Sequence, residues 1–186
     1  MTMRLKMVAV YVLLSLTGAT AGAQQRVTIA PDQQYVALEV LRLSNLEAEL
    51  NDAGQQGFRL RQSAVNEARV MALLERANPK ATFEYRIVSV SAFTTNKADK
   101  EMNAVALEGY RVVPHTFMVK KGVTIFNVEN VVLMERASTP SGTYEYKTLA
   151  AVRTAALDRD VKAALSEGWQ VFDMVYGQIL LERRKN

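Results

Sequence analysis

The sequence predicts an α+β fold of three tandem β-α-β-β modules, each a small, mostly antiparallel sheet with one helix on one face. Two short signatures recur in fixed order in every module, which indicates an internal repeat. One is a glycine followed by an aromatic residue, and the other is a closing Leu-Leu-Glu-Arg or Leu-Met-Glu-Arg. A helical spacing of apolar residues before each glycine is the third observation, and it places one helix in each module.

Alternating apolar and polar residues predict the opening strands at residues 35–41, 83–86 and 144–147, although the alternation is blurred in the first. Each predicted helix carries one apolar stripe. Ser44 and Asp158 stand where an N-cap is useful, because their side-chain oxygens can accept hydrogen bonds from the first turn. The stripes are formed by Leu46, Leu50 and Ala53; by Ala98, Met102 and Val105; and by Leu157, Val161 and Ala164.

The glycine and its aromatic neighbour are the predicted structural residues of each module. A glycine that ends a helix adopts the left-handed conformation at little cost. The aromatic side chain then begins the next strand and points into the core, where its burial favours folding. We therefore expect these residues to act in folding rather than in ligand binding. They are Gly57 and Phe58, Gly109 and Tyr110, and Gly168 and Trp169.

The modules are separated by turn-forming residues, and the second is longer than the others. Its extra residues, about 114–127, are expected to form an extended hairpin because apolar residues flank a Lys-Lys-Gly turn. The predicted organisation is a signal peptide at 1–23, a polar lead-in at 24–34, and modules 1, 2 and 3 at 35–78, 82–138 and 143–186.

An aromatic-Glu-Tyr-Lys/Arg strand, a helix ending in Glu-Gly-Trp and a closing strand ending in Glu-Arg occur together in module 3, at residues 144–147, 167–169 and 180–183. This combination resembles the small bacterial family known as domain of unknown function 4177. Module 2 resembles it well and module 1 weakly. The resemblance implies a fold and supplies no activity.

The N-terminus is typical of an export signal. Arg4 and Lys6 precede an apolar run, and small residues end at Ala23, after which we expect cleavage. The run is too short for a membrane anchor, which needs about 20 apolar residues. We therefore expect a periplasmic or secreted protein with no transmembrane segment after cleavage. No disulfide can contribute to the stability of this protein, because the chain contains no cysteine.

Charge argues against nucleic acid as a partner. Removing residues 1–23 lowers the Lys and Arg count from 23 to 21 against 19 acidic residues, which leaves a formal charge of +2. Such a balanced chain cannot supply the many phosphate contacts that drive nucleic-acid binding. The densest basic cluster, residues 183–185, suggests envelope association as one alternative and a solvated strand end as another.

Few residues suggest catalysis or a metal site. His115 is the only histidine and is expected to lie exposed in a loop, where it lacks the further ligands that a metal requires. Two pairs of carboxylates are spaced two residues apart, which points the side chains of each pair to different sides of a helix. They are Asp158 with Asp160 and Glu47 with Glu49. We identify no catalytic, metal-binding or cofactor-binding residue, and no phosphate or dinucleotide motif occurs.

These observations favour a non-enzymatic binding or scaffold protein that holds an unknown protein or envelope partner at sheet edges or at the module 2 hairpin. The alternative is a periplasmic, hydrolase-like enzyme whose carboxylates converge across modules. The closing Glu-Arg pairs are expected to be solvated charges at strand ends rather than a binding surface.

Overall fold

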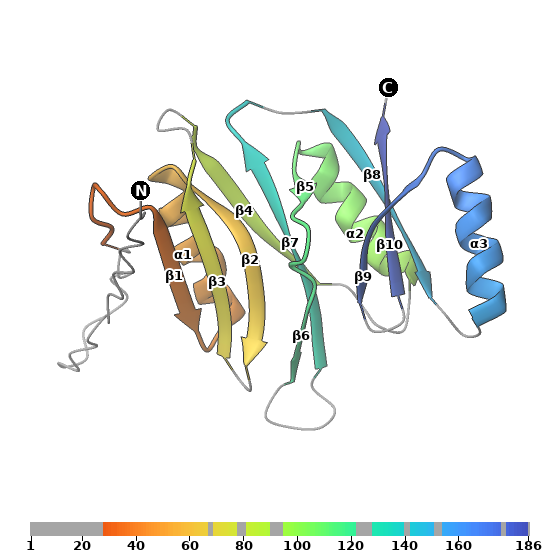
Figure 1. Cartoon of the computed structure of the whole chain (residues 1–186), viewed down its shortest axis with the longest axis horizontal. Coiled ribbons are helices and arrows are strands. Elements are labelled where there is room, and N and C mark those ends of the chain that lie inside the picture. The colour runs from red at the N-terminus through yellow and green to blue at the C-terminus, as the bar shows by residue number, and fades with distance from the viewer. Residues whose placement is uncertain are drawn as a thin grey trace, which may run out of the picture.

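A computed structural model describes residues 28–66, 69–77, 81–89, 95–121, 128–139, 142–150, 154–175 and 178–185. The predicted signal peptide and its cleavage site lie outside these residues. The predicted fold class is confirmed, because these residues form three helices and three small antiparallel sheets, in β-α-β-β order in modules 1 and 3 and with one additional strand after the helix of module 2. The three modules follow one another in a row, with α3 at the end opposite β1 (Figure 1).

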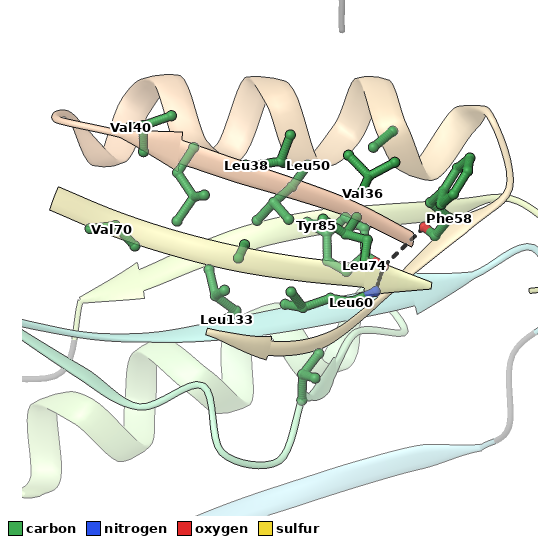
Figure 2. Packing of buried hydrophobic residues seen from close by; sticks show 14 of the residues in the cluster. Val36, Leu38, Val40, Leu50, Phe58, Leu60, Val70, Leu74, Tyr85 and Leu133 are labelled. Atoms are coloured by element: carbon green, nitrogen blue, oxygen red, sulfur yellow. Dashed lines mark hydrogen bonds between the residues drawn. The ribbon is translucent and has the colours of Figure 1, made fainter. Parts of the chain in front are cut away.

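Module 1 contains β1 (Tyr35–Val40), α1 (Leu43–Gln55), β2 (Phe58–Asn66) and β3 (Arg69–Arg76). Its sheet has the order β1-β3-β2, so the last strand lies in the centre. β1 alternates strictly between exposed and buried residues, as a strand with one covered face must. The buried side chains of β1 and β3 pack beneath Leu50 and its neighbours on α1 (Figure 2).

Module 2 contains β4 (Phe83–Ser89), α2 (Thr95–Leu107), β5 (Arg111–Val112), β6 (Met118–Lys121) and β7 (Val128–Ala137). Its sheet has the order β4-β7-β5, and β6 also pairs with β7. β6 lies within the predicted hairpin insertion, and Lys121 faces Val128 across the pair. The two lysines of the expected turn therefore lie in a strand, and the connection at 122–127 lies outside the described residues.

Module 3 contains β8 (Thr143–Ala150), α3 (Thr154–Ser166), β9 (Gln170–Val175) and β10 (Gln178–Lys185), in the sheet order β8-β10-β9. Among the described residues, no helix is long and apolar enough to cross a membrane. The strand order is the same in all three modules: the closing strand lies between the opening strand and the strand that follows the glycine.

Both predicted N-caps are wrong. α1 begins at Leu43 with Arg42 at its N-cap, so Ser44 already lies inside the helix. Asp158 is the fifth residue of α3, where its carboxylate accepts a hydrogen bond from Lys162 Nζ at 2.7 Å. The helices begin earlier than the apolar stripe suggests, because their first turn needs no buried side chain.

Neighbouring modules share a core. Each sheet is covered on one face by its own helix, and the opposite face of sheets 2 and 3 is covered by the module before it. Tyr85 and Leu133 of module 2 belong to the core of module 1, and Tyr146 and Leu180 of module 3 belong to the core of module 2. We call these two contacts between modules the first joint and the second joint.

Candidate functional site

The three glycines of the signature have left-handed backbone, with φ of 86°, 89° and 85° at Gly57, Gly109 and Gly168. This conformation lets the chain turn from the helix into the next strand. The aromatic residues that follow are buried, with Phe58 fully inaccessible, Tyr110 3% exposed and Trp169 8% exposed. The three aromatic residues thus lie one in each core, whereas Gly109 is half-buried and Gly168 is exposed.

The two signatures of each module meet in space. The arginine that closes the module lies over the ring of the aromatic residue, at 4.4–4.7 Å from guanidinium carbon to ring centre. Such cation–π contacts favour burial of one ring face beneath a charge that stays in water. The pairs are Arg76 with Phe58, Arg136 with Tyr110, and Arg183 with Trp169.

The closing arginines of modules 2 and 3 also bind the ends of the helices. Arg136 Nη1 donates to the carbonyl of Glu108 at 3.1 Å, and Arg183 Nη1 donates to the carbonyl of Glu167 at 3.0 Å. Both carbonyls lie just before the glycine, where a helix leaves its last acceptors without partners. Arg183, the first residue of the basic cluster, is therefore used within the fold.

A buried polar cluster forms the first joint. The Tyr85 hydroxyl donates to Glu135 Oε2 at 2.9 Å and accepts from the backbone N–H of Leu60 at 2.8 Å. Arg59 of module 1 donates to Glu135 Oε1 at 2.8 Å. Figure 2 shows Tyr85 reaching from module 2 to Leu60 and Phe58 of module 1. One hydroxyl thereby connects two modules.

The second joint repeats this cluster. Tyr146 donates to Glu182 Oε2 at 2.9 Å and accepts from the N–H of Val112 at 2.9 Å. Arg111 binds both carboxylate oxygens of Glu182, at 2.8 and 3.0 Å. The closing glutamates of modules 2 and 3 are therefore buried and paired, and the expectation that they are solvated charges is wrong.

An asparagine on the preceding helix binds the outer edge of each opening strand. Asn51 of α1 accepts from the N–H of Tyr85 at 2.8 Å and donates to its carbonyl at 3.0 Å. Asn103 of α2 makes the same two bonds to Tyr146, both at 2.8 Å. The helix thus occupies the place of a further strand, which keeps these sheet edges paired.

An acidic residue one turn earlier extends each contact. Glu47 accepts from the N–H of Ile87 at 2.7 Å, and Asp99 accepts from the N–H of Thr148 at 2.8 Å. Burial raises the pKa of Asp99, while the bonds from Thr148 lower it. Sequence reasoning missed all of these joint residues, although Asn51 and Asn103 each lie six residues before a signature glycine.

Burial in the joints shifts the pKa values of the tyrosines and of Glu135. Burial raises the pKa of Tyr85 and that of Tyr146, so both hydroxyls stay protonated and act as donors. Burial also raises the pKa of Glu135, and the attraction of Arg59 and the bond from Tyr85 oppose this shift. With every oxygen of these carboxylates bonded to protein, the joints have the character of structural contacts rather than of proton-transfer sites.

Two cavities border the joints. One lies between modules 2 and 3 beside Thr148 and Asp173, and its volume of 10 Å³ has room for about one water molecule. The other is an open groove of 380 Å³ beside Ser44, Glu47 and Ser89. Each lining contains a single carboxylate, so neither offers the acid/base pair of a hydrolase.

His115 lies in the module 2 insertion and is 78% exposed. Its backbone is left-handed, with φ of 58°, and its N–H donates to Asp173 Oδ2 of module 3 at 2.9 Å. The imidazole Nδ1 lies 3.8 Å from Asp173 Oδ1. His115 is therefore exposed in a loop, as predicted. Its backbone also contacts module 3, which the sequence did not suggest.

The remaining acidic residues are used separately. Asp158 pairs with Lys162 and Asp160 with Arg159 on α3. Burial raises the pKa of Glu49, which lies near Glu47 in sequence. Within the described ranges, no group of three or more histidine, cysteine or acidic side chains is arranged to hold a metal ion.

Comparison with known proteins gives no relative from which a role could be transferred. No family model matches the chain, and neither the curated proteins nor the solved structures contain a significant match.

The two ends of the row differ from the joints. The face of sheet 1 that corresponds to the covered faces of sheets 2 and 3 is open, and we call it the outer face. Its side chains Tyr35, Met71 and Leu73 are 53%, 42% and 42% exposed. Strand register places Tyr35 opposite Glu75, as it places Tyr85 opposite Glu135 in module 2. The outer face therefore has the residues of a joint surface, and no other module of the described residues covers it.

Proposed function

We propose that the protein is an exported, non-enzymatic binding or scaffold protein, built from three copies of one unit and acting in the periplasm or outside the cell. The outer face of module 1 is the observation that carries this proposal. It keeps the residue types of a joint surface, Tyr35 and Glu75 with apolar neighbours, yet the described chain leaves it uncovered. Partly apolar open faces of this kind are typical of protein-binding surfaces.

The rigidity of the row supports a scaffold role. Two joints with shared cores and buried hydrogen bonds fix the modules relative to one another. The same contacts occupy the buried carboxylates, Glu135 and Glu182, that a hydrolase would use. The resemblance to domain of unknown function 4177 stays a prediction and concerns the fold of the unit, not its activity.

The experiment that tests this function is cross-linking of the tagged mature protein in intact cells, followed by purification and mass spectrometry. We expect one reproducible protein partner, recovered from the periplasmic fraction or the medium. Intact-mass measurement of the same material checks removal of residues 1–23. Absence of a partner, or turnover of a hydrolysable substrate that Glu135→Gln or Glu182→Gln abolishes, would favour the enzyme instead.

A further inference from the structure

The three modules differ in the residues that each offers to a following module. We call this set the donor residues. In modules 1 and 2 it comprises an acid, an asparagine and a small residue on the helix, and an arginine after the glycine. At these positions stand Glu47, Asn51, Gly54 and Arg59 in module 1; Asp99, Asn103, Ala106 and Arg111 in module 2; and Asp158, Lys162, Leu165 and Gln170 in module 3.

The small residue is required by close approach of the helix to the next strand. A Cβ atom added at Gly54 would lie 2.3 Å from the backbone oxygen of Phe83. Ala106 at the corresponding place is completely buried in the second joint. Leu165 of α3 is too large for this approach and is instead 48% exposed. The C-terminal end therefore lacks the shape of a donor as well as its asparagine and arginine.

Loss of the donor residues at one end prevents growth of the row. A chain with a donor end and an open acceptor face would bind copies of itself head to tail, and such contacts form open filaments unless they close into a ring. Lys162, Leu165 and Gln170 remove that contact. A second copy of this chain is thus a poor occupant of the outer face, since α1 and α2 are already covered in its own joints.

The outer face keeps the features that accept a donor. Tyr35 donates to Glu75 Oε1 at 3.3 Å, as Tyr85 donates to Glu135. Met71 and Leu73 correspond by register to Val131 and Leu133, which the first joint buries. The outward edge of β1 corresponds to the edge that Asn51 binds in module 2.

Two contacts, one from module 1 and one from the lead-in, satisfy part of this face. Arg61 Nε donates to Glu75 Oε2 at 2.6 Å, and Gln33 Nε2 donates to the carbonyl of Tyr35 at 2.8 Å. They occupy the places that an arginine and an asparagine of a preceding module would take. Both come from partly or largely exposed side chains, whose ion pairs and hydrogen bonds are cheap to exchange.

We propose that the outer face of module 1 is a binding site for a helix and strand of another protein that carry the donor residues. These are an acid, an asparagine four residues later and a small residue three residues after that on the helix, and an arginine that follows a glycine and an aromatic residue at the start of the strand. This inference rests on the proposed function and names its partner class. Arg59 and Arg111 show the charge complementarity required, because each pairs with the glutamate that corresponds to Glu75.

The test restores a donor end to a second molecule and offers it to the wild-type protein. The donor probe is the mature chain with Lys162→Asn, Leu165→Ala and Gln170→Arg, and with Leu73→Glu to block its own outer face. Wild-type protein is the acceptor. We expect a 1:1 complex by light scattering, with a dissociation constant in the μM range or tighter, as for interfaces of standard size.

Matched acceptors decide where the probe binds. Leu73→Glu in the acceptor should weaken binding about tenfold or more, whereas Leu107→Glu on exposed α2 surface should not change it. Arg61→Ala should strengthen binding, because it frees Glu75. All variants except Arg61→Ala should keep the wild-type denaturation midpoint. If the triple-substituted donor end of the probe unfolds, a probe with only Leu165→Ala, Gln170→Arg and Leu73→Glu replaces it.

Three results would overturn the inference: folded probes that do not bind, binding that Leu73→Glu in the acceptor leaves unchanged, and self-association of the wild-type protein through its outer face. The last would make a second copy the occupant. A partner captured in cells equally well by wild type and Leu73→Glu would refute this site while leaving the proposed function intact.

Discussion

The two joints and the two ends of the molecule are built from corresponding residues but in different states. In the joints, Tyr85 and Tyr146 are buried, and each connects a glutamate of its own module to a backbone N–H of the preceding one. At the N-terminal end, Tyr35 makes the corresponding bond to Glu75 but is half exposed. The same tyrosine–glutamate pair is therefore an interior contact in one setting and a surface in the other.

The C-terminal end teaches the complementary lesson. Val171 is the third residue after its glycine, as Leu60 and Val112 are after theirs. Leu60 and Val112 are each 2% exposed, whereas Val171 is 50% exposed. The difference arises because nothing in the described chain covers it. Exposure in this protein thus depends on position in the row rather than on the local sequence, and exchange of residues between joints and ends tests that statement.

The largest effect is expected from placing the end residue in a joint. Gly54→Leu forces a branched side chain against the backbone of Phe83 and should lower the free energy of unfolding by about 3 kcal/mol or more. Urea denaturation of the mature protein measures the change. The control is Leu165→Ala at the corresponding exposed position of α3, which should change stability by less than about 0.5 kcal/mol. Equal effects at both sites would contradict the assigned joint.

A smaller effect is expected from removing one hydroxyl. Tyr85→Phe leaves the N–H of Leu60 buried without its acceptor and should cost about 1–3 kcal/mol. Tyr146→Phe should behave alike, because Val112 loses the same bond. Tyr35→Phe at the outer face should be nearly neutral, since water reaches that hydroxyl. Chemical denaturation of the three variants side by side gives the comparison, and a costly Tyr35→Phe would show that the outer face is covered in solution.

The fold could be predicted from the sequence because its determinants are local. A glycine, an aromatic residue and one helical stripe lie within about one supersecondary unit, and their spacing is legible without knowing what packs on them. The helix starts were less legible, and Ser44 and Asp158 proved to be interior helical residues. Short polar residues suit several positions near a helix start, so composition alone did not fix the first turn.

The joints could not be predicted because they depend on contacts between modules. Asn51 and Tyr85 are 34 residues apart, and neither residue type signals an interface. The closing glutamates looked like strand-end charges, but packing of a preceding module buries Glu135 and Glu182. The available signal was comparative: asparagine and arginine recur at fixed distances from the glycine in modules 1 and 2 and are absent from module 3.

The smallest expected effect is on the pH dependence of stability. A glutamate in a joint and a glutamate at the outer face should change stability with pH in opposite directions. Burial raises the pKa of Glu135 above its ordinary value of 4.5, so between these two values the folded protein binds more protons than the unfolded chain. The contribution of Glu135 is therefore fully present below pH 4.5 and is lost as the pH rises through the raised pKa. Relative to Glu135→Gln, the wild-type protein should lose stability over this rise.

Glu75 should show the opposite sign. The hydrogen bond from Arg61 lowers the pKa of Glu75 below 4.5, so here the unfolded chain binds more protons over the interval. Its stabilising contribution is present above pH 4.5 and is lost as the pH falls through the lowered pKa. Urea midpoints of wild type, Glu135→Gln and Glu75→Gln, measured from about pH 3 to pH 7, give both slopes. Slopes of the same sign would mean that the two glutamates share one environment, and the distinction between joint and outer face would fail.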